Sequence, residues 1–151
     1  MATLSAIITP NNVLTATNTN TLTNKTISGD SNTLTVDGIN NVGFRDVPQN
    51  SKSAAYTLAL SDAGKHIYHP ASDANVRTFT IPANASVAYP VGTAITFINM
   101  TAEVVTIAIT TDTMYLSSDG TTGSRTLAQY GSATCIKITA TEWLISGSGL
   151  T

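Results

Sequence analysis

Apolar and polar residues alternate in short runs over the second two-thirds of the chain. Residues 106–110 (TIAIT) form the clearest run, because they are rich in β-branched side chains, and residues 136–139 (IKIT) alternate strictly. A repeat of two residues is typical of a half-buried strand. The pattern predicts strands over residues 55–60, 65–69, 77–81, 93–99, 104–110, 113–116, 125–128, 133–139 and 142–146.

Turn-forming residues separate these runs. They cluster at residues 61–64, 82–84, 118–120 and 130–132, and residues 140–142 join the last two strands as a short hairpin. Strong helix formers never cluster, so at most a single turn is expected near Ser61 or Ala83. Many short strands at regular spacing predict an all-β fold, a β-sandwich or jelly-roll-like domain over residues 48–151.

Residues 1–47 have a different composition, rich in Thr and Asn and poor in large apolar groups. Such a segment cannot build a conventional core, so it is either disordered or ordered by packing on copies of itself or on another protein. Its low charge and regularly spaced aliphatic residues favour an extended arm ordered by assembly. The residues expected to supply its buried interface are Leu14, Leu22, Ile27, Leu34, Val36 and Ile39.

Charged residues make up 11% of the chain and the formal net charge is −2. The usual charged fraction is about 25%. Lys and Arg are scattered singly, which argues against a nucleic-acid partner. A surface covered by Thr, Ser, Asn and Ala suits burial against neighbouring subunits or stability outside a cell. Neither a signal peptide nor an apolar run long enough to span a membrane is visible, so we expect synthesis and folding in a cytoplasm.

Residues that carry chemistry are sparse. Cys135 is the single cysteine and lies in a strand-like run, where it is expected to be a small buried side chain. His66 and His69 are the two histidines, and residues three apart on a strand point to opposite faces, which disfavours a shared metal. No phosphate loop, nucleophile elbow or local carboxylate pair is present. The sequence therefore predicts no enzyme activity, no catalytic residue, no metal and no cofactor.

Aromatic residues are the remaining candidates for a binding role. Trp143 lies within an apolar strand and is expected in the core. Tyr89, Tyr115 and Tyr130 lie near predicted turns, where exposed rings could face a carbohydrate ligand. We expect these three tyrosines to be the ligand-facing residues if the domain binds a glycan.

Several phrases resemble bacteriophage structural proteins. Residues 21–35 (TLTNKTISGDSNTLT) look like the amino-terminal segments of phage fibre and spike proteins. Residues 60–70 (LSDAGKHIYHP), 78–99 (TFTIPANASVAYPVGTAITFIN) and 123–147 (GSRTLAQYGSATCIKITATEWLISG) are similar to small β modules of phage tail-fibre and head-decoration proteins. The resemblance implies a homotrimer in the virion, in which an amino-terminal arm fixes the protein to the particle and a β knob projects.

The resemblance leaves the part of the virion open. Receptor-binding fibres are commonly much longer than 151 residues, which favours a capsid decoration (cement) or head-spike protein that contacts itself and the major capsid protein or another virion protein. The alternative is a tail-fibre or receptor-binding adhesin that recognises host surface glycans. A small hydrolase that acts at a subunit interface is the remaining, disfavoured possibility.

Overall fold

The computed structural model describes residues 35–36, 39–40 and 46–151. The chain divides into two units, Met1–Gly43 and Phe44–Thr151. The described part of the first unit is a pair of antiparallel two-residue strands, β1 (Thr35–Val36) and β2 (Ile39–Asn40), in which Val36 is opposite Ile39. The described part of the second unit begins at residue 46 and contains all of the strands from β3 onwards.

The described residues are almost entirely strands and irregular connections, which confirms the prediction of an all-β chain. The strands of the second unit are β3 (Gln49–Ser51), β4 (Tyr56–Thr57), β5 (His66–His69), β6 (Arg77–Ile81), β7 (Ala94–Asn99), β8 (Val105–Ile109), β9 (Thr113–Leu116), β10 (Arg125–Lys137) and β11 (Glu142–Leu150). A single 3₁₀ turn at Leu60–Asp62 agrees with the turn expected near Ser61. Within the described ranges, no helix is long and apolar enough to cross a membrane.

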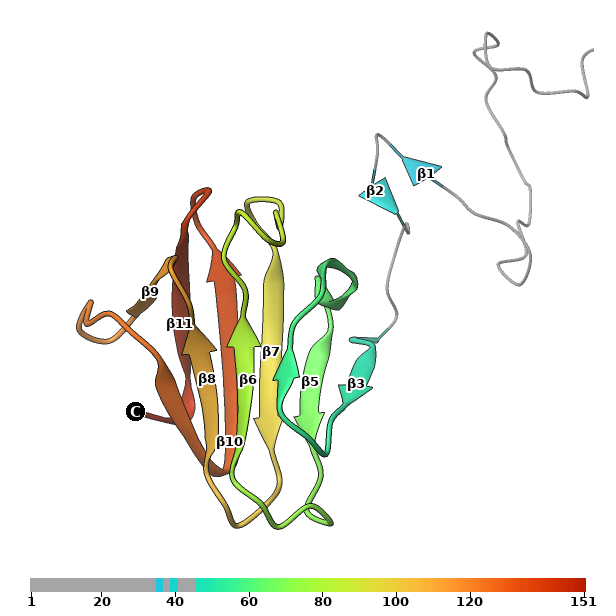
Figure 1. Cartoon of the computed structure of the whole chain (residues 1–151), viewed down its shortest axis with the longest axis vertical. Helices are drawn as coiled ribbons and strands as arrows, with labels where there is room; N and C mark the ends of the chain where they lie inside the picture. Colours follow the sequence, from blue (N-terminus) through green and yellow to red (C-terminus); the bar gives the residue numbers. More distant parts are fainter. Residues whose placement is uncertain (1–34, 37–38, 41–45) are drawn as a thin grey trace, which may run out of the picture. The chain divides into compact units, whose positions relative to one another are not determined.

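The nine strands form one curled sheet in which the chain alternates between two halves (Figure 1). Strands β3, β5 and β7 pair in parallel and make the first half-sheet. Strands β4, β6 and β8 also pair in parallel and make the second half-sheet. Each connection from β3 to β8 therefore crosses from one half-sheet to the other, so the chain winds in flattened coils around a shared core.

Strand β10 joins the two half-sheets. Its first three residues, Arg125–Leu127, pair antiparallel with β8, and Ser132–Ile136 pair antiparallel with β7. Its second part also pairs with β11, and β11 in turn pairs in parallel with β9. Sequence analysis predicts two separate strands here, over residues 125–128 and 133–139. The structure shows one bent strand, Arg125–Lys137, in which the pairing register shifts between Leu127 and Ser132.

The bend in β10 lies at Tyr130 and Gly131. Tyr130 has a φ of 60°. No other non-glycine residue in the part of the chain that the structure describes has a positive φ. This left-handed conformation is uncommon for a bulky side chain. A Cβ on Gly131 would lie 2.6 Å from a methyl carbon of Leu127, so the residue after Tyr130 has no room for a side chain. Local geometry thus lets one strand serve both half-sheets.

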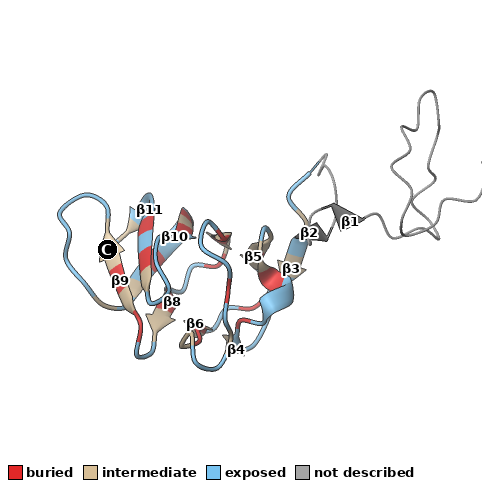
Figure 2. Ribbon diagram, turned by 90° about the horizontal axis from the view of Figure 1, so that it is seen from above, coloured by how far each residue is buried: buried red, intermediate tan, exposed pale blue. Residues whose placement is uncertain are grey.

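The core lies between the half-sheets and is built from alternate residues of the strands. Figure 2 shows the buried positions alternating with exposed ones along β10 and β11. Phe79 of β6 and Phe97 of β7 stack across the core with their ring centroids 6.5 Å apart. Cys135 and Trp143 are fully buried, as predicted, and burial raises the pKa of the Cys135 thiol. The buried apolar residues are Leu58, Ile67, Phe79, Ile81, Tyr89, Ile95, Phe97, Val105, Ile107, Met114, Leu127, Ala133, Cys135, Trp143 and Ile145.

Gly147 of β11 lies directly against the backbone of β10. A Cβ at this position would lie 2.2 Å from the carbonyl oxygen of Ser132 and 2.5 Å from the Cα of Ala133. Both atoms belong to the backbone, so they cannot rotate away as the end of a side chain could. The pairing of β10 with β11 therefore requires glycine at residue 147.

We predict that Gly147→Ala lowers the free energy of unfolding by about 3 kcal/mol, because the new methyl group forces β11 away from β10. Urea denaturation followed by tryptophan fluorescence measures this change. Ser148→Ala, at the next, exposed position, serves as the control and should leave the midpoint almost unchanged. A Gly147→Ala protein as stable as the wild type would show that the two strands have room to separate.

Candidate functional site

His66 and His69 lie on opposite faces of β5. His66 is half-buried, and its Nδ1 lies 3.0 Å from the carbonyl oxygen of Val47. His69 is fully buried and points into the interior of the unit. The two rings are therefore separated by the strand, as the alternation of side chains predicts. Within the described residues, no three His, Cys, Asp or Glu side chains come together as a metal site.

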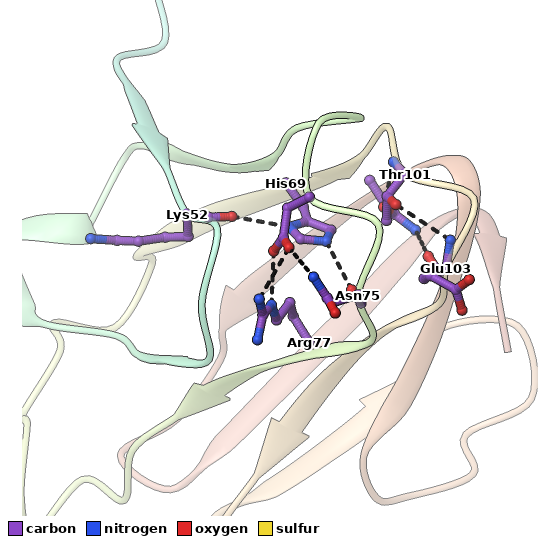
Figure 3. A network of polar contacts seen from close by, with 8 residues as sticks. Lys52, His69, Asn75, Arg77, Thr101 and Glu103 are labelled. Atoms are coloured by element: carbon purple, nitrogen blue, oxygen red, sulfur yellow. Dashed lines mark hydrogen bonds and ion pairs between the residues drawn. The ribbon is translucent and has the colours of Figure 1, made fainter.

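His69 belongs to a polar network at the carboxyl end of β5 (Figure 3). Its Nδ1 lies 3.0 Å from the carbonyl oxygen of Lys52, and its Nε2 lies 3.3 Å from that of Asn75. The edge of the imidazole also contacts the ring of Phe79, with centroids 5.9 Å apart. These contacts tie the β3–β4 connection and the loop before β6 to the core. His69 therefore holds connections together at this end of the unit.

Asp73 is the charged centre of the same network. Nε of Arg77 donates to its Oδ2 at 2.8 Å, and a terminal nitrogen of Arg77 donates to its Oδ1 at 3.0 Å. These hydrogen bonds, with a further one from Asn75, lower the pKa of Asp73 from 3.8 to about 2. A two-pronged contact of this kind fixes direction as well as charge. It closes the loop that leads into β6.

Asn99 forms the second half of the network, at the end of β7. Its side-chain amide donates to the carbonyl oxygens of Glu103 at 2.8 Å and Leu127 at 3.0 Å, and its Oδ1 accepts from the backbone N–H of Thr101 at 3.0 Å. The residue is fully buried. Because the side chain donates to two carbonyl oxygens and also accepts from an N–H, a carboxamide suits this position, whereas a carboxylate that can only accept does not. Asn99 thus pins the β7–β8 connection to β10.

A buried carboxylate fixes the loop between β4 and β5. Asp62 is 1% exposed and accepts hydrogen bonds from the Asn50 side chain, the Tyr56 hydroxyl and the backbone N–H of Ala59, at 2.7, 2.8 and 2.8 Å. Burial is the largest cause of a raised Tyr56 pKa, and the hydrogen bond to Asp62 adds to it. All of these contacts are internal, so Asp62 has a structural role.

The three tyrosines expected to face a ligand differ in their surroundings. The expectation for Tyr89 is wrong, because its side chain is 3% exposed, its hydroxyl donates to the carbonyl oxygen of Ala59 at 2.6 Å and its ring packs edge-on against Trp143. Burial also raises the pKa of Tyr89. Tyr115 is half-buried and donates to Glu142 at 3.1 Å. Tyr130 is 70% exposed, and its role in contacting a ligand stays a prediction.

A pocket of about 280 Å³ lies where β8 ends and β9 begins. Its lining combines the carboxylate of Asp112 with hydroxyl groups and two apolar side chains: Ile109, Thr110, Asp112, Thr113, Met114, Thr122, Gly123 and Ser124. Asp112 is 8% exposed, and both of its oxygens accept from the backbone N–H of Asn84, at 3.2 and 3.1 Å. Asp112 therefore caps a turn that lies 28 residues away in sequence.

The same end of the unit contains a buried lysine that sequence reasoning missed. Lys137 is 1% exposed, and its Nζ donates to Oδ1 of Asn84 at 2.7 Å. Nζ also lies 5.3 Å from the ring centroid of Trp143. The alternation of residues 136–139 does indicate a strand with one buried face, and the buried face is the one that carries Lys137, because Ile136 is 42% exposed. A half-buried strand ordinarily turns its apolar residues to the core, but in this run Ile136 and Ile138 are each 42% exposed and the lysine between them is buried.

Four of the predicted arm residues, Leu14, Leu22, Ile27 and Leu34, lie outside the described residues. Val36 and Ile39 lie in β1 and β2 and face each other in the backbone register. The interface role of all six residues stays a prediction. Neither a protein-family model nor a curated protein matches the sequence.

We predict that Asn99→Asp lowers the free energy of unfolding by about 3 to 5 kcal/mol, because a buried carboxylate would face two carbonyl oxygens. Gln129→Glu makes the same amide-to-carboxylate change at an exposed position and serves as the control. Thermal and urea denaturation measure both variants. Equal stabilities for the two variants would refute the assigned role of Asn99.

We also predict a loss of stability in acid that depends on Asp73. Because its pKa is about 2 in the folded state and 3.8 ordinarily, its stabilising contribution is complete above about pH 4 and is lost as the pH falls through about 2. Urea denaturation across this range should show a smaller acid-dependent loss in Arg77→Gln than in the wild type. Lys65→Gln, which removes one positive charge elsewhere, should retain the wild-type slope; identical slopes for all three proteins would contradict the prediction.

Proposed function

We propose that the chain is a non-enzymatic structural protein of a phage virion, most simply a capsid decoration (cement) or head-spike protein that docks through residues 1–47. The observation that carries this proposal is the contrast between the two parts of the chain. Residues 46–151 contain a core of their own, whereas residues 1–47 are dominated by Thr and Asn. A self-sufficient knob preceded by a segment with little apolar surface is the plan of a protein that attaches itself to a larger assembly.

The outer surface of the knob also supports assembly with like molecules. Ile136 of β10 and Leu144 of β11 are opposite each other in the register and are 42% and 37% exposed. Thr96 and Thr134 lie side by side on β7 and β10, with hydroxyl oxygens 3.0 Å apart. An exposed apolar and hydroxyl-bearing sheet surface of this kind suits burial against another subunit. We propose that three copies associate through this face and the arm.

The finer description as a β-sandwich knob belongs to the same proposal. The two half-sheets face each other across one core, as the layers of a sandwich do. Their strands pair largely in parallel, whereas the strands of a jelly roll are antiparallel. The curled sheet thus supports a rigid projecting knob, whose order of strands differs from that of a jelly roll.

Tyr130 favours the alternative function, a tail-fibre or receptor-binding adhesin for host glycans. Its ring is the most exposed aromatic in the described part of the chain, and its backbone holds the sparsely populated left-handed conformation. Residues kept in such conformations cluster at functional sites. In this alternative, Tyr130 contacts the sugar and the arm fixes the knob to the tail.

The proposal predicts that a chain lacking residues 1–45 folds but no longer joins the particle. Purified full-length and truncated proteins would be mixed with particles that lack this protein, and occupancy would be measured by sedimentation and electron microscopy. Circular dichroism of the truncated protein controls for folding. Full occupancy by the truncated protein would refute docking through the arm.

The same proteins separate the two functions. Binding to heads without binding to host cells supports decoration. Adsorption of the isolated knob to host cells, lost in Tyr130→Ser, would replace it with the adhesin function.

A further inference from the structure

Lys137 is in an unusual environment for a lysine. Its side chain is 1% exposed, and the described residues offer its Nζ one hydrogen-bond acceptor, Oδ1 of Asn84 at 2.7 Å. The ion pairs of the described part are both made by Asp73 at the other end of the unit, so Nζ has no carboxylate within ion-pair distance. A buried ammonium with one neutral acceptor and an aromatic ring as its surroundings is costly to maintain.

The group beside Nζ is an electrophile. Because a carbonyl bond is about 1.23 Å long, a 2.7 Å contact to Oδ1 places the carboxamide carbon of Asn84 within about 3.9 Å of Nζ. Reacting atoms in a near-attack arrangement are about 3 to 3.5 Å apart. A shift of Nζ by about 0.5 Å towards the carboxamide carbon, which small torsional changes of the lysine side chain can supply, brings the two atoms within that distance.

The backbones of Lys137 and Asn84 are both fixed by hydrogen bonds to other parts of the unit. The backbone of Lys137 is fixed at the end of β10, where its N–H donates to the carbonyl oxygen of Thr93 at 2.9 Å. The backbone N–H of Asn84 is held by both oxygens of Asp112, at 3.2 and 3.1 Å. The fully buried Trp143 ring lies 5.3 Å from Nζ, so the surroundings of the amine are apolar on that side. Thus a nucleophile and an amide 53 residues apart are fixed against each other.

We propose that Lys137 and Asn84 form an intramolecular isopeptide bond. The lone pair of the deprotonated Nζ forms a bond to the carboxamide carbon, and the carbonyl electron pair moves to Oδ1. When that pair returns, the bond from the carbon to Nδ2 breaks, and Nδ2 leaves as ammonia with the proton that Nζ loses. Starting from the lysine ammonium, the products are a secondary amide and an ammonium ion, so no proton, oxidant or cofactor is consumed.

The bond would change the unit in two ways. It removes the buried positive charge, and it joins β10 to the β6–β7 connection by a covalent link. Cross-linking two distant points of a chain stabilises the fold chiefly by restricting the unfolded state. Cys135 is the single cysteine, so the chain cannot form an internal disulfide. The isopeptide bond would take the place of a disulfide as a covalent cross-link. The inference stands whether the protein is part of a head or a fibre.

Intact mass spectrometry of the purified full-length chain tests the proposal. We expect a mass lower than that of the sequence by one ammonia molecule, after incubation at neutral pH. Proteolysis followed by tandem mass spectrometry should recover a branched peptide that contains residues 84 and 137. A full chain that retains the sequence mass after prolonged incubation would overturn the proposal.

Two variants separate this bond from other losses of ammonia. Lys137→Arg keeps a cation able to donate to Asn84 but removes the primary amine, and it should retain the full sequence mass, as should Asn84→Ala. Cyclisation of Asn84 with its own backbone would release ammonia equally in Lys137→Arg, so a mass loss in that variant would also overturn the proposal. Lys65→Arg, at a half-buried lysine near the start of β5, is the control and should lose ammonia as the wild type does.

Discussion

The structure depends on β10 pairing with both half-sheets. Residues Arg125–Leu127 of this strand pair with β8 and Ser132–Ile136 pair with β7, so the two parallel half-sheets share one antiparallel strand. Without it, each half-sheet would be a set of very short strands with an open edge and an uncovered apolar face. The bend at Tyr130 is the geometric condition for this arrangement, since it turns the strand without breaking it.

The functional features follow from the winding of the chain around this strand. Each crossing between half-sheets leaves connections at the two ends of the core, and buried polar groups fix them there. Asp73 and Asn99 order one end, while Asp112 and Lys137 order the other. The outer faces of the half-sheets carry Thr, Ser and isolated apolar side chains, which suits the proposed contact with other subunits. A rigid knob with little surface charge and a Thr/Asn-rich leading segment is consistent with the proposed role as an attached virion component.

The strands were largely predictable because alternation of apolar residues is a local property. The ranges 77–81 and 113–116 agree with β6 and β9 at both ends. The continuity of β10 was not predictable, because Tyr130 and Gly131 are typical of a turn, and the pairing of the strand on both sides of them is made with residues far away in sequence. The parallel winding, the burial of Tyr89 and the contact of Lys137 with Asn84 depend on residues far apart in sequence. No local pattern encodes such contacts, so the polar groups at the ends of the core had to be found in the structure.

Native-state hydrogen exchange of the full-length chain tests most directly whether β10 makes the two half-sheets one cooperative unit. We predict that the slowest amides of β7 and of β8 exchange with the same free energy of opening, equal to that of global unfolding. Exchange of the β4–β6–β8 half at a clearly lower free energy than the β3–β5–β7 half would contradict this account.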